Sequence, residues 1–238
     1  MTTTPAPAAL MGEPTSFETV TFDLYRDIHK GIRQELFALV ELAGSIDPAD
    51  GGARADLAAR VRSTVDLLIA HAEHEDTGMQ PAIELHLPVL AERIVVDHER
   101  IEGRMAALVA LVDAVAADND GPRASMHHLY LDLASFTADY LDHQDLEERV
   151  VMPALEAAVG VEACLAMHQA ILAAIPPDEM GLSLAIMLPA MNLADRTELL
   201  GAMQAEAPPE AFAAVWGLAG SVLEPADHAA LGARLGLA

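Results

Sequence analysis

Two stretches of the sequence share one pattern: HAEHEDTGMQP at residues 71–81 and HQDLEERVVMP at residues 143–153. Both read His-x-x-x-Glu followed by an acidic residue, and both place a proline at the eleventh position. Four residues of α-helix turn through about 400°, so the histidine and glutamate of each pair lie on one face, one turn apart. A single such pair is common on a solvated face, but two copies with the same trailing acid and proline favour a shared role. We therefore predict that both pairs supply metal ligands.

The composition favours helices and excludes several classes of function. Of the 238 residues, 53% are apolar but only 4% are aromatic, a poor basis for sheet. A net charge of −24 repels phosphate backbones, and no apolar run reaches bilayer length, so we expect neither nucleic acid nor membrane as a partner. The lone Cys164 excludes thiolate metal clusters. Without a secretory signal at the N-terminus, we expect a cytoplasmic protein.

The spacing of apolar residues predicts an all-α fold. Short connections such as Asp118–Pro122 separate four long helical stretches, which predicts an antiparallel up-down-up-down four-helix bundle over residues 17–160. Gly160 is a suitable cap for its end. Gly78 and Pro81 are expected to bend the second helix. The four predicted helices are 16–43, 53–85, 88–117 and 123–159.

The two ends of the chain differ from this central part. Residues 1–16 are rich in Thr, Pro and Ala and are expected to be a disordered tail. Residues 161–238 carry many prolines, which predict a C-terminal appendage of short helices. These helices are too short to be stable alone, so they must pack on each other, on the bundle or on a second subunit. They are predicted at 178–188, 194–205, 210–220 and 226–235.

The remaining walls of the predicted bundle offer further ligands. The second and fourth helices would run parallel and point their His-x-x-x-Glu pairs inward at the same depth, while His29 and His98 share the apolar faces of the first and third helices. Imidazoles and carboxylates together suit a pair of borderline metal ions. The predicted ligands are His29, His71, Glu75, His98, Glu102, His143 and Glu147. Residues expected to support a ligand or to replace one are His74, Glu148, Tyr25 and Tyr140.

The segment Asp27-Ile-His29, the two duplicated strings and His98 between them resemble the hemerythrin-like family of HHE cation-binding domains, over about residues 20–158. The resemblance implies a four-helix bundle around a non-haem di-iron centre, whose two irons are joined by carboxylates and by an oxo or hydroxo group. The pattern of a ferritin-like site, Glu-x-x-His on two helices, is missing from the sequence.

The resemblance also implies a role for each matching residue. The histidines of the first and second helices would bind one iron, and those of the third and fourth helices would bind the other. Glu75 and an acid after His143 would bridge them. The family's spacing would place that acid at Glu148, whereas the internal repeat favours Glu147.

One departure from the oxygen-carrying members bears on function. They have a histidine where this chain has Glu102, and a carboxylate there would add negative charge and favour ferric iron. We therefore expect a di-iron oxidoreductase that reacts with O2, H2O2 or nitric oxide. Two alternatives stay open: a module that senses O2 or iron and signals through 161–238 to a protein partner or a second copy, and a biosynthetic di-iron oxidase.

Overall fold

The computed structural model describes residues 19–237 and is helical throughout, with loops and no strand among those residues, which confirms the all-α class. The predicted disordered tail at 1–16 lies outside the described residues. No single helix in the described part is long and apolar enough to cross a membrane, although Pro122–Val159 and Val161–Ala174, bent by 113° at their junction, pass that test as a pair.

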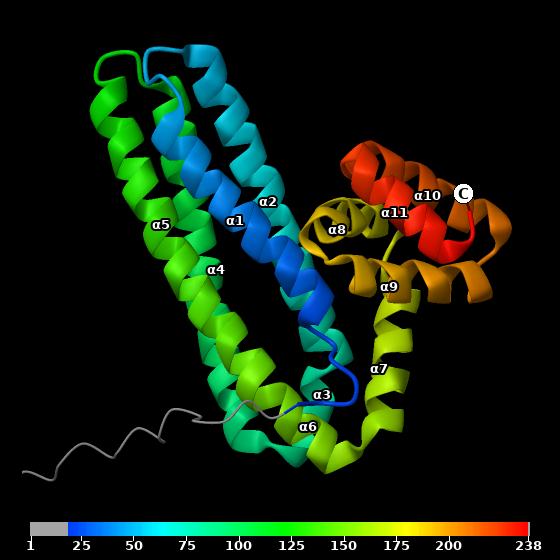
Figure 1. Ribbon diagram of the computed structural model, residues 1–238. Helices are drawn as coiled ribbons and strands as arrows, with labels where there is room; N and C mark the ends of the chain where they lie inside the picture. The colour runs from blue at the N-terminus through cyan, green and yellow to red at the C-terminus, as the bar shows by residue number, and fades with distance from the viewer. Residues whose placement is uncertain (1–18, 238) are drawn as a thin grey trace, which may run out of the picture.

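Four long helices lie side by side, and consecutive ones run in opposite directions (Figure 1). The third of the four begins and ends at the predicted residues 88 and 117, and the other three differ from their predicted bounds at both ends. Their buried residues, such as Ile32, Leu36 and Leu39, recur every three or four positions, which gives each helix one apolar stripe. The four are α1 (Arg26–Ser45), α2 (Gly51–Gly78), α4 (Pro88–Ala117) and α5 (Pro122–Leu146).

The first helix begins later than predicted. Residues 19–25 are not helical, although the apolar spacing was continuous with that of the helix that follows. The side chain of Asp23 accepts hydrogen bonds from the backbone N–H groups of Tyr25 and Arg26, at 3.0 and 3.1 Å, and so starts α1. The carboxylate of Glu156, in the short helix Met152–Val159, accepts from the N–H of Thr21 and holds the segment before α1 against that helix.

Both duplicated strings interrupt their helices near the shared proline. Helix α2 ends at Gly78, and after Met79 a new helix, α3 (Gln80–His86), begins. The helix is therefore interrupted where a bend was predicted. After α5 a π-helical turn, η1 (Glu147–Val151), leads into α6 (Met152–Val159). Proline lacks the N–H that an α-helix needs, which accounts for a wider turn directly before it. Gly160, with φ of 83°, ends α6 as predicted.

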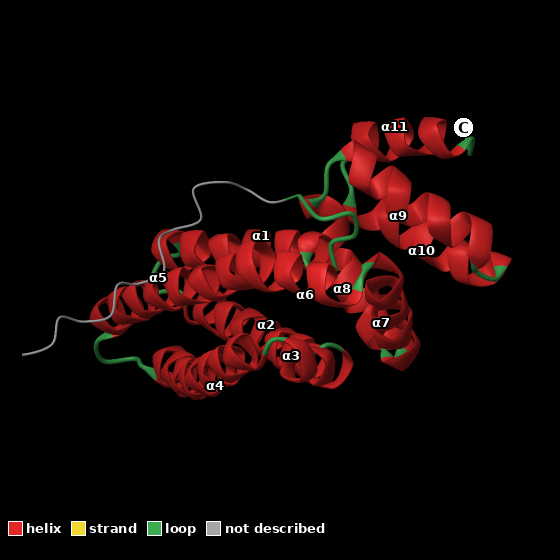
Figure 2. Cartoon of the chain, turned by 90° about the horizontal axis from the view of Figure 1, so that it is seen from below, coloured by secondary structure: helices red, strands yellow, loops and turns green. Residues whose placement is uncertain are grey.

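Five further helices form the C-terminal appendage. Four lie close to their predicted ranges, but the first of the five was not predicted. They are α7 (Val161–Ala174), α8 (Pro177–Ala190), α9 (Leu193–Glu206), α10 (Pro209–Val222) and α11 (Pro225–Leu235). The last four surround a small core of their own that includes Leu188, Leu200 and Leu231. They stand to one side of the long helices (Figures 1 and 2).

Two glycines let the appendage approach the long helices. A Cβ atom on Gly31 of α1 would lie 3.1 Å from backbone atoms of Ile186 in α8. A Cβ on Gly78, at the end of α2, would lie 2.3 Å from the side chain of Ile171 in α7. Only glycine permits both approaches without movement, so the appendage packs directly on α1 and on the end of α2.

Two apolar cores fill the space between the long helices. One contains Ile32, Leu68 and Met105, and the other, towards the α3 and α6 end, contains Met79, Ile94 and Leu146. Six of the seven predicted metal ligands lie along the helices between members of these two cores, and Glu102 does not. Packed apolar side chains therefore enclose a polar layer on both sides along the length of the helices.

Candidate metal centre

Six of the seven predicted ligands meet in this polar layer: five come from the four long helices, and Glu147 comes from η1. Their side chains are almost completely buried, from His29 at 0% and Glu147 at 1% to His71 at 11% exposed. The ligand atoms of two overlapping groups each lie within 4.8 Å of one another, and Glu75 belongs to both. The groups are His29, His71 and Glu75, and Glu75, His98, His143 and Glu147.

The two glutamates occupy the middle of the cluster. Oε1 of Glu75 lies 3.0 Å from Nε2 of His71, and Oε2 lies 3.6 Å from Nε2 of His98. Glu147 is arranged in the opposite sense, with Oε1 3.2 Å from Nε2 of His143 and Oε2 3.6 Å from Nε2 of His29. Each carboxylate therefore directs one oxygen to one histidine pair and the other oxygen to the second pair.

Several of these atoms are buried without a hydrogen-bond partner among the described residues. They include both oxygens of Glu75, Oε2 of Glu147 and Nε2 of His98. A buried carboxylate with neither a hydrogen bond nor a counter-ion costs several kcal/mol in an apolar interior. Cations between the carboxylates and imidazoles would satisfy all of these atoms at once, so the residues fit a metal site.

In each duplicated string, the acid that follows the glutamate contacts one of the two histidines that lie outside the strings. Oδ1 of Asp76 lies 3.0 Å from Nδ1 of His98, and Oε1 of Glu148 lies 3.1 Å from Nδ1 of His29. Each string thus supplies one histidine, one central glutamate and one acid that orients a histidine on another helix. An acid on Nδ1 fixes the ring so that Nε2 points at the cluster.

Glu148 is itself anchored by a cation. Arg33 donates to its two oxygens, at 2.7 and 2.9 Å. Burial opposes ionisation of Glu148, but the hydrogen bonds from His29 and Arg33 outweigh it and lower the pKa of Glu148 to about 2. Glu148, predicted to support a ligand or to replace one, lies outside the central cluster, behind His29.

The electrostatics of the cluster suit cation binding. Burial raises the pKa of Glu147, and the neighbouring charge of Glu75 raises it further. Two carboxylates this close repel each other unless a proton or a cation lies between them. Burial also lowers the pKa of His143 to about 3, which keeps its imidazole in the neutral form that binds metals.

The other predicted site residues lie at or outside the edge of the cluster. The rings of Tyr25 and His29 are 5.0 Å apart between centroids, and those of Tyr140 and His143 are 5.9 Å apart, so both tyrosines border the cluster. His74 points away from it, with Nε2 3.2 Å from Oε1 of Glu179 in α8.

Glu102 is the one predicted ligand that the structure keeps away from the others. Its side chain is exposed to solvent. The buried face of α4 runs through His98, Ile101 and Met105, and position 102 lies beyond the edge of that stripe. The shared His-x-x-x-Glu spacing was therefore misleading for this pair. Asp76 and Arg33 were not predicted, although the duplicated trailing acid was a signal for Asp76.

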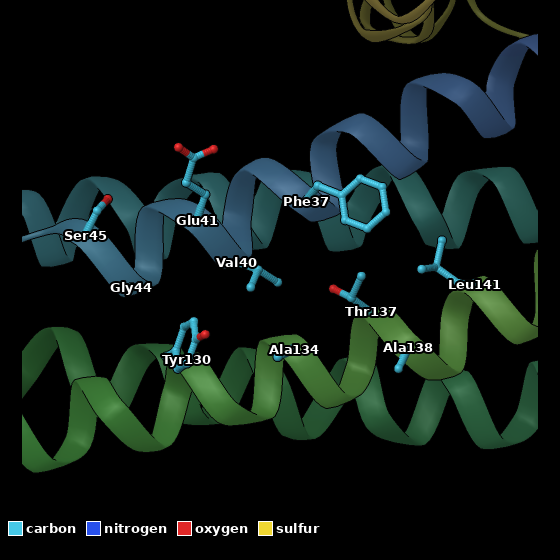
Figure 3. Close-up of a pocket in the computed structure, with 10 residues that line it drawn as sticks. All are labelled: Phe37, Val40, Glu41, Gly44, Ser45, Tyr130, Ala134, Thr137, Ala138 and Leu141. Atoms are coloured by element: carbon cyan, nitrogen blue, oxygen red, sulfur yellow. The ribbon is translucent and has the colours of Figure 1, made fainter.

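A shallow groove of about 600 Å³ lies between α1 and α5, and its lining includes Phe37, Tyr130 and Ala138 but no residue of the metal cluster (Figure 3).

Four imidazoles and two carboxylates meet between the helices, with little exposure to solvent. This site defines the class of the protein: a helical protein that binds cations. The family model for the hemerythrin HHE cation binding domain matches residues 20–155, more than half of the chain, so the chain belongs to that family. No curated protein and no solved structure matches the chain. The predicted resemblance is confirmed, and α7 to α11 lie beyond the matched residues.

Proposed function

We propose that the chain is a non-haem di-iron protein whose long helices form the antiparallel up-down-up-down bundle of its family. The observation that carries this proposal is the opposed placement of the two central carboxylates. Glu75 and Glu147 each offer one oxygen to the His29 and His71 side and one to the His98 and His143 side. Two cations joined by two carboxylates require this division, and a mixed nitrogen and oxygen donor set suits iron.

Bound iron would supply one-electron redox chemistry towards O2, H2O2 or nitric oxide. The chain's own residues set the conditions for it. Glu148 and Asp76 orient His29 and His98 through their Nδ1 atoms. The apolar cores on both sides keep water away and strengthen the electrostatic contacts within the layer. The buried Tyr25 and Tyr140 place phenol rings beside the two histidine pairs.

The test is the reaction of iron-loaded, anaerobically reduced protein with O2, H2O2 and nitric oxide, followed by visible absorption. We expect a rapid change with at least one of the three and turnover with the physiological oxidant. Glu75→Ala should abolish the change, whereas Glu102→Ala should leave it intact, because Glu102 is exposed. An iron-loaded protein that reacts with none of the three would refute the redox proposal.

A sensing role is the second candidate, and one contact favours it. His74, one turn from His71 on α2, bonds to Glu179 of α8, so the appendage touches the helix that carries two ligands. If the appendage reports the state of the centre, reduction should alter hydrogen exchange in α8. Equal exchange in the oxidised and reduced proteins would count against sensing.

A further inference from the structure

A cavity of about 360 Å³ lies between the ligand-bearing helices and the appendage. Residues of the α1 start and of α2 form one wall, and residues of α7, α8 and α9 form the other. Its volume falls within the range of small-molecule sites, roughly 300–1,000 Å³. Three of the five appendage helices contribute to it, and all of them lie beyond residues 20–155, which match the family.

The cavity reaches the metal cluster. His71 and Glu75 both line it. They are also the most exposed side chains of the cluster, at 11% and 10%, whereas His29 and Glu147 are at 0% and 1%. The two side chains of the cluster with the largest exposed fraction are therefore the two that line this cavity.

The wall that the appendage contributes is mainly apolar and adaptable. Ile171 and Leu184 line it together with Met180, Met187 and Met203, and Met79 faces them from the other side. Methionine side chains are flexible and polarisable, and they adapt to apolar ligands of varied shape. Such a wall would recognise hydrocarbon or aromatic surface and offers few partners for hydrogen bonds.

The charged residues at the cavity disfavour an anionic ligand. Apart from the cluster, the carboxylates that line it belong to Asp23, Asp27, Glu179 and Glu198, and the one guanidinium is that of Arg26. Arg26 already contacts Asp27 at 3.0 Å and Glu198 at 3.5 Å. A ligand with a carboxylate would meet repulsion from these four side chains, and Arg26 is already paired with two of them.

We propose that this cavity is the binding site for an uncharged, mainly apolar organic molecule, held beside His71 and Glu75 by the C-terminal appendage. The proposal rests on the proposed metal centre for its functional meaning, since it makes the bound molecule the organic substrate of that centre. It assigns α7, α8 and α9 of the appendage the role of forming the substrate wall.

The first experiment measures binding of the uncharged fluorophore N-phenyl-1-naphthylamine to the full chain, with and without iron. We expect saturable binding to both forms, displacement by 1-octanol, and much weaker displacement by octanoate. Ser183→Trp places an indole on the α8 wall and should weaken binding roughly tenfold or more by filling the site. Ala202→Trp on α9 is the second blocking variant, should the first fail to fold.

Ala138→Trp is the matched control, because Ala138 lines the groove between α1 and α5 instead. It should bind the fluorophore as the wild type does. Equal binding by the wild type and both blocking variants would overturn the proposal, as would equal displacement by octanol and octanoate.

The second experiment separates this proposal from that of the metal centre. In the iron-loaded wild type, the fluorophore or octanol should shift the visible absorption, and Ser183→Trp should remove the shift without changing the iron content. Iron uptake with no fluorophore binding would overturn the cavity proposal and leave the metal centre standing. Fluorophore binding by a chain that takes up no iron would refute the metal centre, and with it the substrate role of the cavity.

Discussion

Replacing Glu148 by alanine should weaken metal binding without removing any residue of the central cluster. The change deletes the acceptor that lies 3.1 Å from Nδ1 of His29 and leaves Arg33 without its two contacts at 2.7 and 2.9 Å. His29 is fully buried, so no water replaces the lost partner cheaply. Loss of an acid that orients a metal-bound histidine costs about 10–100-fold in affinity, or roughly 1.4–2.8 kcal/mol.

The assay is a competition titration of metal-free protein against a coloured chelator. Arg33→Ala should have a smaller effect than Glu148→Ala, because His29 keeps its acceptor. Glu102→Ala is the control, since Glu102 stands one turn from His98 but is exposed, and it should bind metal as the wild type does. Wild-type affinity in Glu148→Ala, or a loss in Glu102→Ala equal to that in Glu148→Ala, would refute the arrangement described here.

Three further predictions concern stability. Glu147→Gln should raise the melting temperature of the metal-free protein, because it removes a buried carboxylate that faces Glu75. In differential scanning fluorimetry, added metal should stabilise the wild type by about 4 kcal/mol at a thousandfold excess over Kd, and Glu147→Gln should abolish this stabilisation. Phe136→Ala should cost about 3–5 kcal/mol in urea unfolding with the helical circular dichroism retained, because the ring is 1% exposed in the main core; a loss below 1 kcal/mol would contradict that packing. Gly31→Val should separate α8 from α1, because its side chain would meet the backbone of Ile186, and limited proteolysis should then cut between α7 and α8 faster than in the wild type; equal rates would contradict the contact.

The sequence pattern was sufficient for the helical class and for most of the metal cluster. A helical stripe that is interrupted by histidine, as around His29 and His98, marks a polar layer, and the repeat of His-x-x-x-Glu with its trailing acid marks the helices that face each other across it. These signals depend only on local periodicity. Local signals also predicted the helix over residues 88–117 and the four last C-terminal helices, three of which start at a proline.

What the sequence did not supply depends on contacts between distant residues. The late start of α1 follows from the side chain of Asp23 and from the contact of Thr21 with Glu156, 135 residues away. Glu102 was assigned to the site from its spacing alone, and only the packing of α4 shows that the stripe passes it by. Helix α7 has no proline at its start to mark it, and it packs on the end of α2, where Ile171 meets Gly78.

The most direct test of the central claim is the metal content of the full chain purified from iron-replete cells, measured by elemental analysis together with the visible spectrum. We predict two irons per chain, and fewer than one in Glu75→Ala, because Glu75 belongs to both groups of ligand atoms. Zinc alone, or no metal in carefully handled wild-type protein, would contradict it.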